Sequence, residues 1–397
     1  MSNWITLTLT LVIQAMVSMA LLTLPVMAPV VAQDMQVSPA LVGLYVSMTY
    51  GGAMFASLMG GAAVNRLGAI RVSQWGLLLC AAGLLLCAVP WFPAMGLGAV
   101  LIGCGYGPIT PASSHLLART TPKHQMSLVF SLKQTGVPLG SLLAGAIVPS
   151  MLLALSWHSS LAVVAAVCVL CAALSQPLRG ELDQDRQPNL PVRWGSWIAP
   201  IRLVLAHRAL ATMAACSFMF SMVQLSLTTY LVTFLHDDLN YALIAAGLAL
   251  SATQLGGMAG RVAWGFVADR WLGARRMLLL LASLMALGAL ASATLTVDTP
   301  QALVWLILVT FGASAIGWNG VYLAEVARRA PEGMASVATG GTLAFTFSGV
   351  VIGPPVFGAL STYFGTYRAG FIGLMVVACV SGLLLYRSQR PAPLAVT

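Results

Sequence analysis

Two cationic side chains lie deep inside apolar stretches of this sequence, where charged groups are rare. Lys133 and Arg261 are both flanked by apolar residues on each side. An arginine presents a planar fork that can hold a carboxylate through two hydrogen bonds, whereas a lysine acts as a point charge. These residue types in these positions therefore point to the binding of an anion.

The acidic residues do not occupy comparable positions. Of the ten Asp and Glu residues, Glu325 alone approaches the interior of an apolar stretch, and we expect it to pair with a nearby arginine. A charge in an apolar medium is costly unless it is paired. Because no acidic side chain is available for Lys133 and Arg261, a bound anion is a candidate partner for both.

Composition places most of the chain in lipid. The 397 residues are 59% hydrophobic and 7% charged, and the mean hydropathy is +0.90, whereas a soluble domain carries roughly 25% charged residues. The net charge of +9 is scattered between apolar runs, which argues against nucleic-acid binding. The seven cysteines lie in apolar stretches without metal-type spacing, and no catalytic constellation or phosphate loop is visible. We therefore expect no enzyme, metal or cofactor.

Apolar runs of about 20 residues or more predict an all-α membrane protein with twelve transmembrane helices. The predicted division is an N-terminal six-helix half at 1–177, a cytoplasmic linker at 178–208 and a C-terminal six-helix half at 209–397. The predicted spans are 4–32, 39–63, 72–91, 94–118, 127–150, 158–177, 209–235, 242–267, 276–296, 301–327, 333–361 and 366–387.

Orientation follows from the basic residues. If the N-terminus is cytoplasmic, the loops on that side collect nearly all of the 19 Lys and Arg residues, and the opposite loops hold Arg368. Cytoplasmic loops are enriched in Lys and Arg. Both termini are therefore predicted to be cytoplasmic, in a multi-pass protein of the plasma membrane, with a bacterial inner membrane favoured.

One motif occurs twice, about half a chain apart, after the second and the eighth predicted helices. The copies are Gly61-x-x-x-Asn65-Arg66-x-Gly68-x-x-Arg71 and Gly265-x-x-x-Asp269-Arg270-x-x-Gly273-x-Arg275-Arg276. A glycine lets neighbouring helices approach closely, and the acid and arginines can cap a helix end or form ion pairs.

These segments resemble the loop 2–3 and loop 8–9 signature of the major facilitator superfamily. The resemblance implies two pseudo-symmetric six-helix halves, alternating access and a conformational latch at the cytoplasmic side. It departs from the pattern at Asn65, where Asp is usual, so the N-terminal copy should form a weaker ionic latch. The latch residues that it implies are Asn65, Arg66, Arg71, Asp269, Arg270 and Arg276.

The same resemblance places helices 5 and 8 opposite one another, and so Lys133 opposite Arg261. The arginine in helix 8 is similar to the carboxylate-binding arginine of monocarboxylate and oxalate-type carriers. Two other interpretations stay open: Arg261 reaches toward Asp269 or lipid headgroups, and Lys133 likewise reaches toward the membrane surface. The polar residues that are candidates to complete a substrate site are Gln134, Gln254, Gln14, Tyr45, Gln224, Tyr230, Trp318, Asn319 and Tyr322.

The sequence thus predicts a monomeric secondary transporter, a symporter or exchanger, for a small organic anion, with protons as one candidate coupling ion. The alternative is a multidrug or amphiphile efflux transporter. The lack of an intramembrane carboxylate weighs against cationic drugs but not against neutral ones. A non-transporting sensor or membrane enzyme is a third class, which no feature of the sequence supports.

Overall fold

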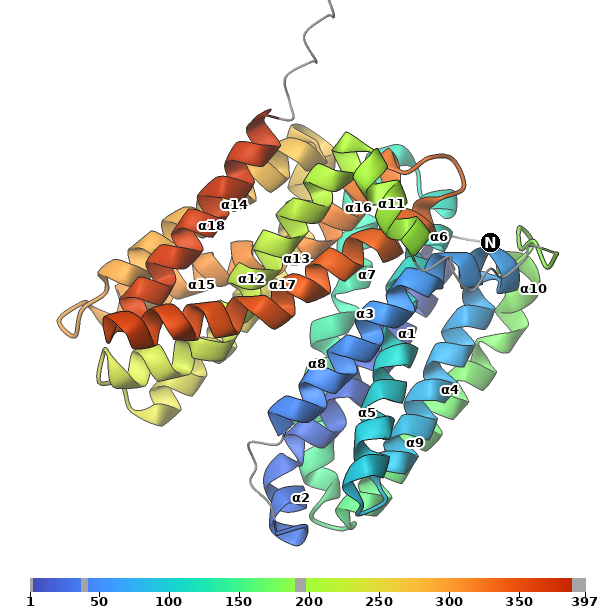
Figure 1. Cartoon of the computed structure of the whole chain (residues 1–397), viewed down its shortest axis with the longest axis horizontal. Coiled ribbons are helices and arrows are strands. Elements are labelled where there is room, and N and C mark those ends of the chain that lie inside the picture. Colours follow the sequence, from blue (N-terminus) through green and yellow to red (C-terminus); the bar gives the residue numbers. More distant parts are fainter. Residues whose placement is uncertain (1–2, 37–41, 190–197, 388–397) are drawn as a thin grey trace, which may run out of the picture.

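The computed structural model describes residues 3–36, 42–189 and 198–387, and the regular elements within these ranges are all helical (Figure 1). Both chain ends and the 190–197 part of the predicted linker lie outside the described residues. Among the helices that are described, nine are long and apolar enough to cross a membrane. The all-α membrane fold is thus confirmed, while the total of twelve spans and the side on which the termini lie stay predictions.

The helices form two bundles, one from each half of the chain (Figure 1). The first contains α1 (Asn3–Val26), α2 (Ala28–Asp34), α3 (Val42–Leu67), α4 (Ala69–Cys87), α5 (Phe92–Tyr106), α6 (Ile109–Thr120), η2 (Lys123–Gln125), α7 (Met126–Gln134), α8 (Gly136–Met151) and α9 (Trp157–Leu174). The second contains α12 (Arg208–Asp237), α13 (Leu243–Val267), η5 (Ala268–Leu272), α14 (Ala274–Thr294), α15 (Gln301–Gly317), α16 (Asn319–Arg329), α17 (Ala335–Phe364) and α18 (Tyr367–Arg387). Between them lie η3 (Gln176–Leu178), α10 (Arg179–Leu182) and α11 (Ala199–Ala206).

Several spans that the sequence predicts as continuous are interrupted. The predicted spans 4–32, 94–118, 127–150 and 301–327 correspond to the pairs α1/α2, α5/α6, α7/α8 and α15/α16. Proline explains two of the interruptions, because it lacks an N–H and cannot close the helical hydrogen bond. Pro108 lies in the break between α5 and α6, and Pro138 lies just after the break between α7 and α8. Such breaks leave main-chain carbonyls without a helical partner.

Each bundle has its own apolar core, and its outer surface is apolar as well. Leu84 and Leu161 are buried in the first bundle, and Leu278 and Phe311 in the second. Large apolar side chains such as Leu306 remain exposed on the outside. Helices that are apolar on all sides suit a lipid environment, because every backbone group is already hydrogen-bonded within the helix.

The bundles meet at one end, near α6, α7, α11 and α16, and spread apart toward α2 and the end of α12 (Figure 1). At the closed end α3 packs against α17, and α7 packs against α13 and α16. A Cβ on Gly61 would lie only 2.5 Å from the Cα of Val337, so glycine is required for this approach. If the orientation predicted from the basic residues holds, the closed end is cytoplasmic and the structure faces outward.

The described start of the linker belongs to the first bundle. Asp183 is buried and accepts hydrogen bonds from the main-chain N–H groups of Ile70 (2.8 Å) and Arg71 (3.1 Å) in the first turn of α4. Burial raises the pKa of the Asp183 carboxyl, and the two N–H groups oppose that rise. Asp185 Oδ2 lies 2.6 Å from His115 Nε2 on α6, and Asp185 also forms an ion pair with Arg119 in the last turn of that helix. This segment therefore fixes the ends of α4 and α6 within one half.

Candidate substrate-binding site

Lys133 lies in the last turn of α7, immediately before the break at Thr135. Its side chain is 1% exposed. The ammonium Nζ donates to the side-chain oxygen of Gln14 on α1 (2.8 Å) and to that of Gln134 (3.1 Å). Two neutral amide oxygens, rather than a carboxylate, are thus the hydrogen-bond partners of Lys133.

Arg261 on α13 is 3% exposed and reaches from the second half into the first. Its Nε donates to the main-chain oxygen of Ile316 (3.1 Å), in the last turn of α15. Its Nη1 donates to the main-chain oxygen of Gln134 (2.6 Å). That oxygen has no helical partner, because the residue four positions on is Pro138. The guanidinium therefore binds carbonyls that two broken helices, one in each half, leave available.

The two cations thus converge on Gln134, and the charge of Arg261 acts on Lys133. Neither cation forms an ion pair with any acidic side chain in the described parts of the chain. Arg261 reaches across to the Gln134 carbonyl of the first half, whereas Lys133 contacts Gln14 and Gln134 within its own half. The alternative in which Arg261 reaches to Asp269 is wrong for this structure, because Asp269 binds other donors.

Two further side chains extend the polar cluster around Gln14. Thr110, just after the break between α5 and α6, donates to the Gln14 side-chain oxygen (3.3 Å). The Gln14 amide nitrogen donates to Ser18 one turn further along α1 (3.4 Å). Sequence reasoning did not select Thr110 or Ser18. The Gly107-Pro108 pair could have indicated Thr110, because it predicts a helix break, and polar residues next to a break are candidates for contacts inside the bundle.

The second half contains a related cluster beside the Ile316 carbonyl. Trp318 and Asn319 follow the break between α15 and α16, and both donate to the side-chain oxygen of Gln224 on α12, at 3.0 and 3.2 Å. These predicted residues lie two and three positions along the chain from the carbonyl that Arg261 binds. In each half, a glutamine on the first helix of the bundle thus accepts hydrogen bonds from residues just after a break in its fourth span.

Other predicted substrate residues lie apart from the cation pair. Tyr45 donates to the main-chain oxygen of Leu21 (3.3 Å) inside the first bundle. Tyr230 stacks on Phe357, with ring centroids 4.7 Å apart. Gln254 shares a face with Arg261 by spacing, yet it is exposed and no hydrogen bond joins the two among the described contacts.

Tyr322 is buried against the ring of Trp318, with centroids 5.2 Å apart. This contact belongs to the interior of the second bundle, where α15 and α16 meet. The structure therefore brings together Lys133, Arg261, Gln134 and Gln14, places the Gln224 cluster next to them, and leaves Tyr45, Tyr230, Gln254 and Tyr322 outside the cation pair.

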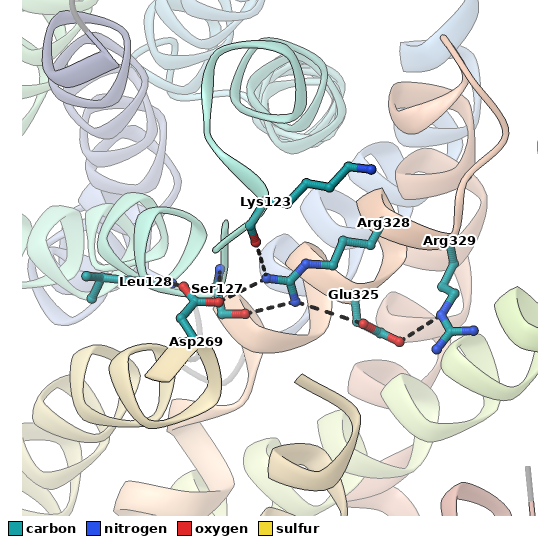
Figure 2. Close-up of polar contacts among 7 residues, drawn as sticks. All are labelled: Lys123, Ser127, Leu128, Asp269, Glu325, Arg328 and Arg329. Carbon is teal, nitrogen blue, oxygen red and sulfur yellow. Dashed lines mark hydrogen bonds and ion pairs between the residues drawn. The ribbon is translucent and has the colours of Figure 1, made fainter. Parts of the chain in front are cut away.

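Asp269 joins the halves at the closed end (Figure 2). Its carboxylate accepts hydrogen bonds from the main-chain N–H groups of Ser127 (3.1 Å) and Leu128 (2.7 Å), at the start of α7. It also forms an ion pair of 2.9 Å with Arg328, at the end of α16. A carboxylate at a helix N-terminus is favourable, because it satisfies free N–H groups and opposes the helix dipole. Asp269 thus holds the helix that carries Lys133.

Arg328 makes this contact a network (Figure 2). Its guanidinium also donates to Ser127 Oγ (3.1 Å) and to the Lys123 main-chain oxygen (3.0 Å). Glu325 lies 4.0 Å from Arg328 and forms an ion pair of 2.9 Å with Arg329. The expectation that Glu325 pairs with an arginine is therefore confirmed.

The other predicted latch residues behave differently. Asn65 accepts one hydrogen bond of 3.4 Å from Ser336 at the start of α17, a weaker contact than the one Asp269 makes. The ion pair of Asp269 is with Arg328, and not with Arg270 or Arg276 as the motif led us to expect. Arg270 and Arg276 are exposed on η5 and α14 and form no ion pair within the described residues, although Arg276 lines the same pocket as Asp269 and Arg328. Within the described residues, Arg66 and Arg71 likewise form no ion pair.

Two bundles joined through a cationic centre are the architecture of a secondary transporter, and comparison with known families agrees. The family model of the Major Facilitator Superfamily matches residues 7–348. The chain therefore belongs to this superfamily. It is a multi-pass transporter of the plasma membrane and not an enzyme.

Individual relatives are distant but nearly full-length. The hexuronate transporter of Bacillus subtilis is 23% identical over 389 residues, which cover 93% of this chain and 90% of the relative. The benzoate transport protein of Acinetobacter baylyi is 22% identical over 410 residues, covering 92% and 87%. Among solved structures, the transporter FucP in its outward conformation superposes with a TM-score of 0.78 at 17% identity, covering 98% of this chain and 100% of FucP. That likeness supports the fold.

Proposed function

We propose that this protein carries a small organic anion with a carboxylate group across the membrane by alternating access. Lys133 and Arg261 are the residues that hold the carboxylate. The observation that carries the proposal is the convergence of two buried cations, one from each half, with no acidic partner among the described residues. A carboxylate entering between the halves supplies the missing charge.

The geometry favours a carboxylate over a larger or softer anion. Arg261 uses Nε and Nη1 for main-chain oxygens, and within the described residues no hydrogen-bond acceptor engages its other amino group. Lys133 uses two of its three possible donor hydrogens on Gln14 and Gln134. If one carboxylate oxygen accepts from Arg261 and the other accepts from Lys133, the remaining donor groups of both side chains have acceptors. The relatives named above are described as transporters of hexuronate and benzoate, and both of these compounds carry a carboxylate.

Alternating access then requires the halves to separate at the closed end. The carboxylate bridges a residue of α7 and a residue of α13, so its binding energy acts across the same contact that Asp269 and Arg328 stabilise. A ligand shifts a conformational equilibrium only through its different affinity for the two states. A bridging anion meets this condition, because the distance between its two cations depends on how the halves are placed.

The test is binding to the purified protein. We expect D-glucuronate and benzoate to raise the melting temperature, while glucose and tetraphenylphosphonium do not. Arg261→Gln should abolish the shift, and the exposed Arg276→Gln serves as the matched control. Stabilisation by tetraphenylphosphonium or by neutral amphiphiles, with no response to either acid, would support the efflux alternative instead.

A further inference from the structure

The two buried cations differ in one chemical respect. An arginine guanidinium keeps its proton at any physiological pH, whereas a lysine ammonium can release its proton when it is buried. Low-dielectric surroundings disfavour the charged lysine, and a second cation nearby disfavours it further. Lys133 is 1% exposed and feels the charge of Arg261. The site therefore combines one permanent charge with one that a proton can switch.

The groups that surround α7 leave Lys133 without a counter-charge. The elements packed against α7 are α16, α13, α1, α6, α8, η5 and η2. Of these, α1 and α8 carry no titratable side chain, and α13 carries Arg261 alone. The titratable groups on the remaining elements are Tyr322, Glu325, Arg328 and Arg329 on α16, His115 and Arg119 on α6, Asp269 and Arg270 on η5, and Lys123 and His124 on η2.

The acids among them are already engaged elsewhere. Asp269 pairs with Arg328, and Glu325 pairs with Arg329, both at the closed end. His115 contacts Asp185 of the linker. Proton relays in membrane proteins are commonly built from Asp, Glu or His. Within the described parts of this chain, no Asp, Glu or His lies next to the substrate site. The phenol of Tyr106 interacts with Arg261, but a tyrosine keeps its proton at neutral pH, so Lys133 is the group there that can exchange a proton.

We propose that Lys133 is the proton-binding residue of the transport cycle, so that one proton accompanies each monovalent organic anion. This inference rests on the proposed function. In the empty site Lys133 is a neutral amine, and it still donates its two hydrogens to Gln14 and Gln134. When a carboxylate binds, the amine nitrogen takes up a proton from the open side and becomes an ammonium. On the other side the carboxylate leaves, the N–H bond breaks and the proton returns to water.

Charge balance makes this cycle electrically neutral. The empty site carries the single charge of Arg261. The loaded site carries the charges of Arg261 and Lys133 and the opposite charge of the carboxylate, which gives the same total. The empty protein and the loaded protein can therefore each change between the two conformations of the transport cycle at the same electrostatic cost, because the net buried charge is the same in both.

The lysine content of the chain permits a direct measurement. Lys123 and Lys133 are its two lysines, and Lys123 is exposed. A Lys123→Arg protein labelled with 13C at lysine Cε gives a single NMR signal, which reports the charge of Lys133. We expect the charged form to persist to higher pH with saturating D-glucuronate than in the empty protein, in which Lys133 should be neutral over part of the accessible pH range. A signal that stays charged throughout, with and without glucuronate, would overturn the proposal.

Transport by Lys133→Arg provides the second readout, because arginine keeps a fixed charge. In proteoliposomes without a membrane potential, the wild-type protein should accumulate glucuronate along a pH gradient, up to about tenfold for each pH unit at one proton per anion. The Lys133→Arg variant should still bind glucuronate, ignore the pH gradient and respond to membrane potential. Persistent accumulation driven by the pH gradient in this variant contradicts the proposal. If neither glucuronate nor benzoate binds the wild type, the proposed function itself fails and this inference fails with it.

Discussion

Arg261 donates a hydrogen bond of 2.6 Å to the main-chain oxygen of Gln134, and this contact joins the two halves of the transporter at its cationic centre. The acceptor is available because Pro138 cannot supply the helical N–H. The same guanidinium binds Ile316 in the other half. Arg261 is therefore both a candidate ligand for the substrate and a structural link between the halves.

Arg261→Gln should weaken binding of D-glucuronate by roughly one to two decades, the range for a lost charge-assisted hydrogen bond of about 1.5–3 kcal/mol. Arg261→Lys should recover only part of the affinity, because the compact ammonium of a lysine lacks the spread, planar donors by which Arg261 reaches Gln134 and Ile316 at the same time. Isothermal titration calorimetry measures both. Full affinity in Arg261→Lys would show that the fork geometry is not used.

Gln14→Glu changes one group of the Lys133 shell into a carboxylate of the same size. The new acid would lie where the Gln14 oxygen now accepts from Lys133 at 2.8 Å, so it should neutralise the lysine from within the protein. Anion affinity should fall by at least tenfold, because the site no longer lacks a negative charge. Gln254→Glu, on an exposed glutamine, is the control. Equal affinity in both variants would remove Gln14 from the site.

Asp269→Asn removes the ion pair with Arg328 and weakens the cap on α7. The closed end should then open more often, so amide hydrogen exchange at residues 126–134 should become faster and transport slower, while glucuronate still binds. Asp298→Asn, at an exposed aspartate, controls for the loss of one charge. Wild-type exchange and transport in Asp269→Asn would exclude a latch role.

Asn65→Asp should act in the opposite direction. The side chain of Asn65, on α3, contacts the start of α17, where it accepts from Ser336, and a negative charge at a helix N-terminus contributes about 0.3–1 kcal/mol. The state that is closed at this end should gain up to about fivefold in population, which slower hydrogen exchange across residues 335–343 would report. Faster exchange there would mean that the asparagine copy is not a weakened latch.

Gly61→Ala places a methyl group where the two halves touch. The added Cβ would lie 2.5 Å from Val337 Cα, so α3 and α17 must move apart and the closed end should open. Gly51→Ala on the same helix adds a methyl group that meets no heavy atom within 4 Å. Accessibility of the closed end, measured by hydrogen exchange across α17, should rise in Gly61→Ala alone. An equal rise in both variants would point to a loss of glycine flexibility rather than to steric contact.

Patterns along the chain were enough to predict the class of protein. Apolar runs need no tertiary information, because a lipid environment requires each span to satisfy its own backbone. The repeated motif located Asp269 and Asn65, and the difference between their contacts follows the difference between a carboxylate and an amide. The unusual pair of Lys133 and Arg261 could be found because charges in apolar runs are costly and therefore conspicuous.

The tertiary structure alone decided which groups meet. Arg328, rather than Arg270 or Arg276, pairs with Asp269, because the end of α16 comes to lie beside η5 although α14 and α15 separate the two in the sequence. Arg261 donates to the carbonyls of Gln134 and Ile316, which lie next to helix breaks. Both carbonyls are far from Arg261 in the sequence, so the sequence alone did not reveal these contacts. Tyr45 and Tyr230 lie inside separate bundles, although their types suited a substrate site. Composition and spacing describe single helices, whereas these contacts depend on how helices from two halves pack together.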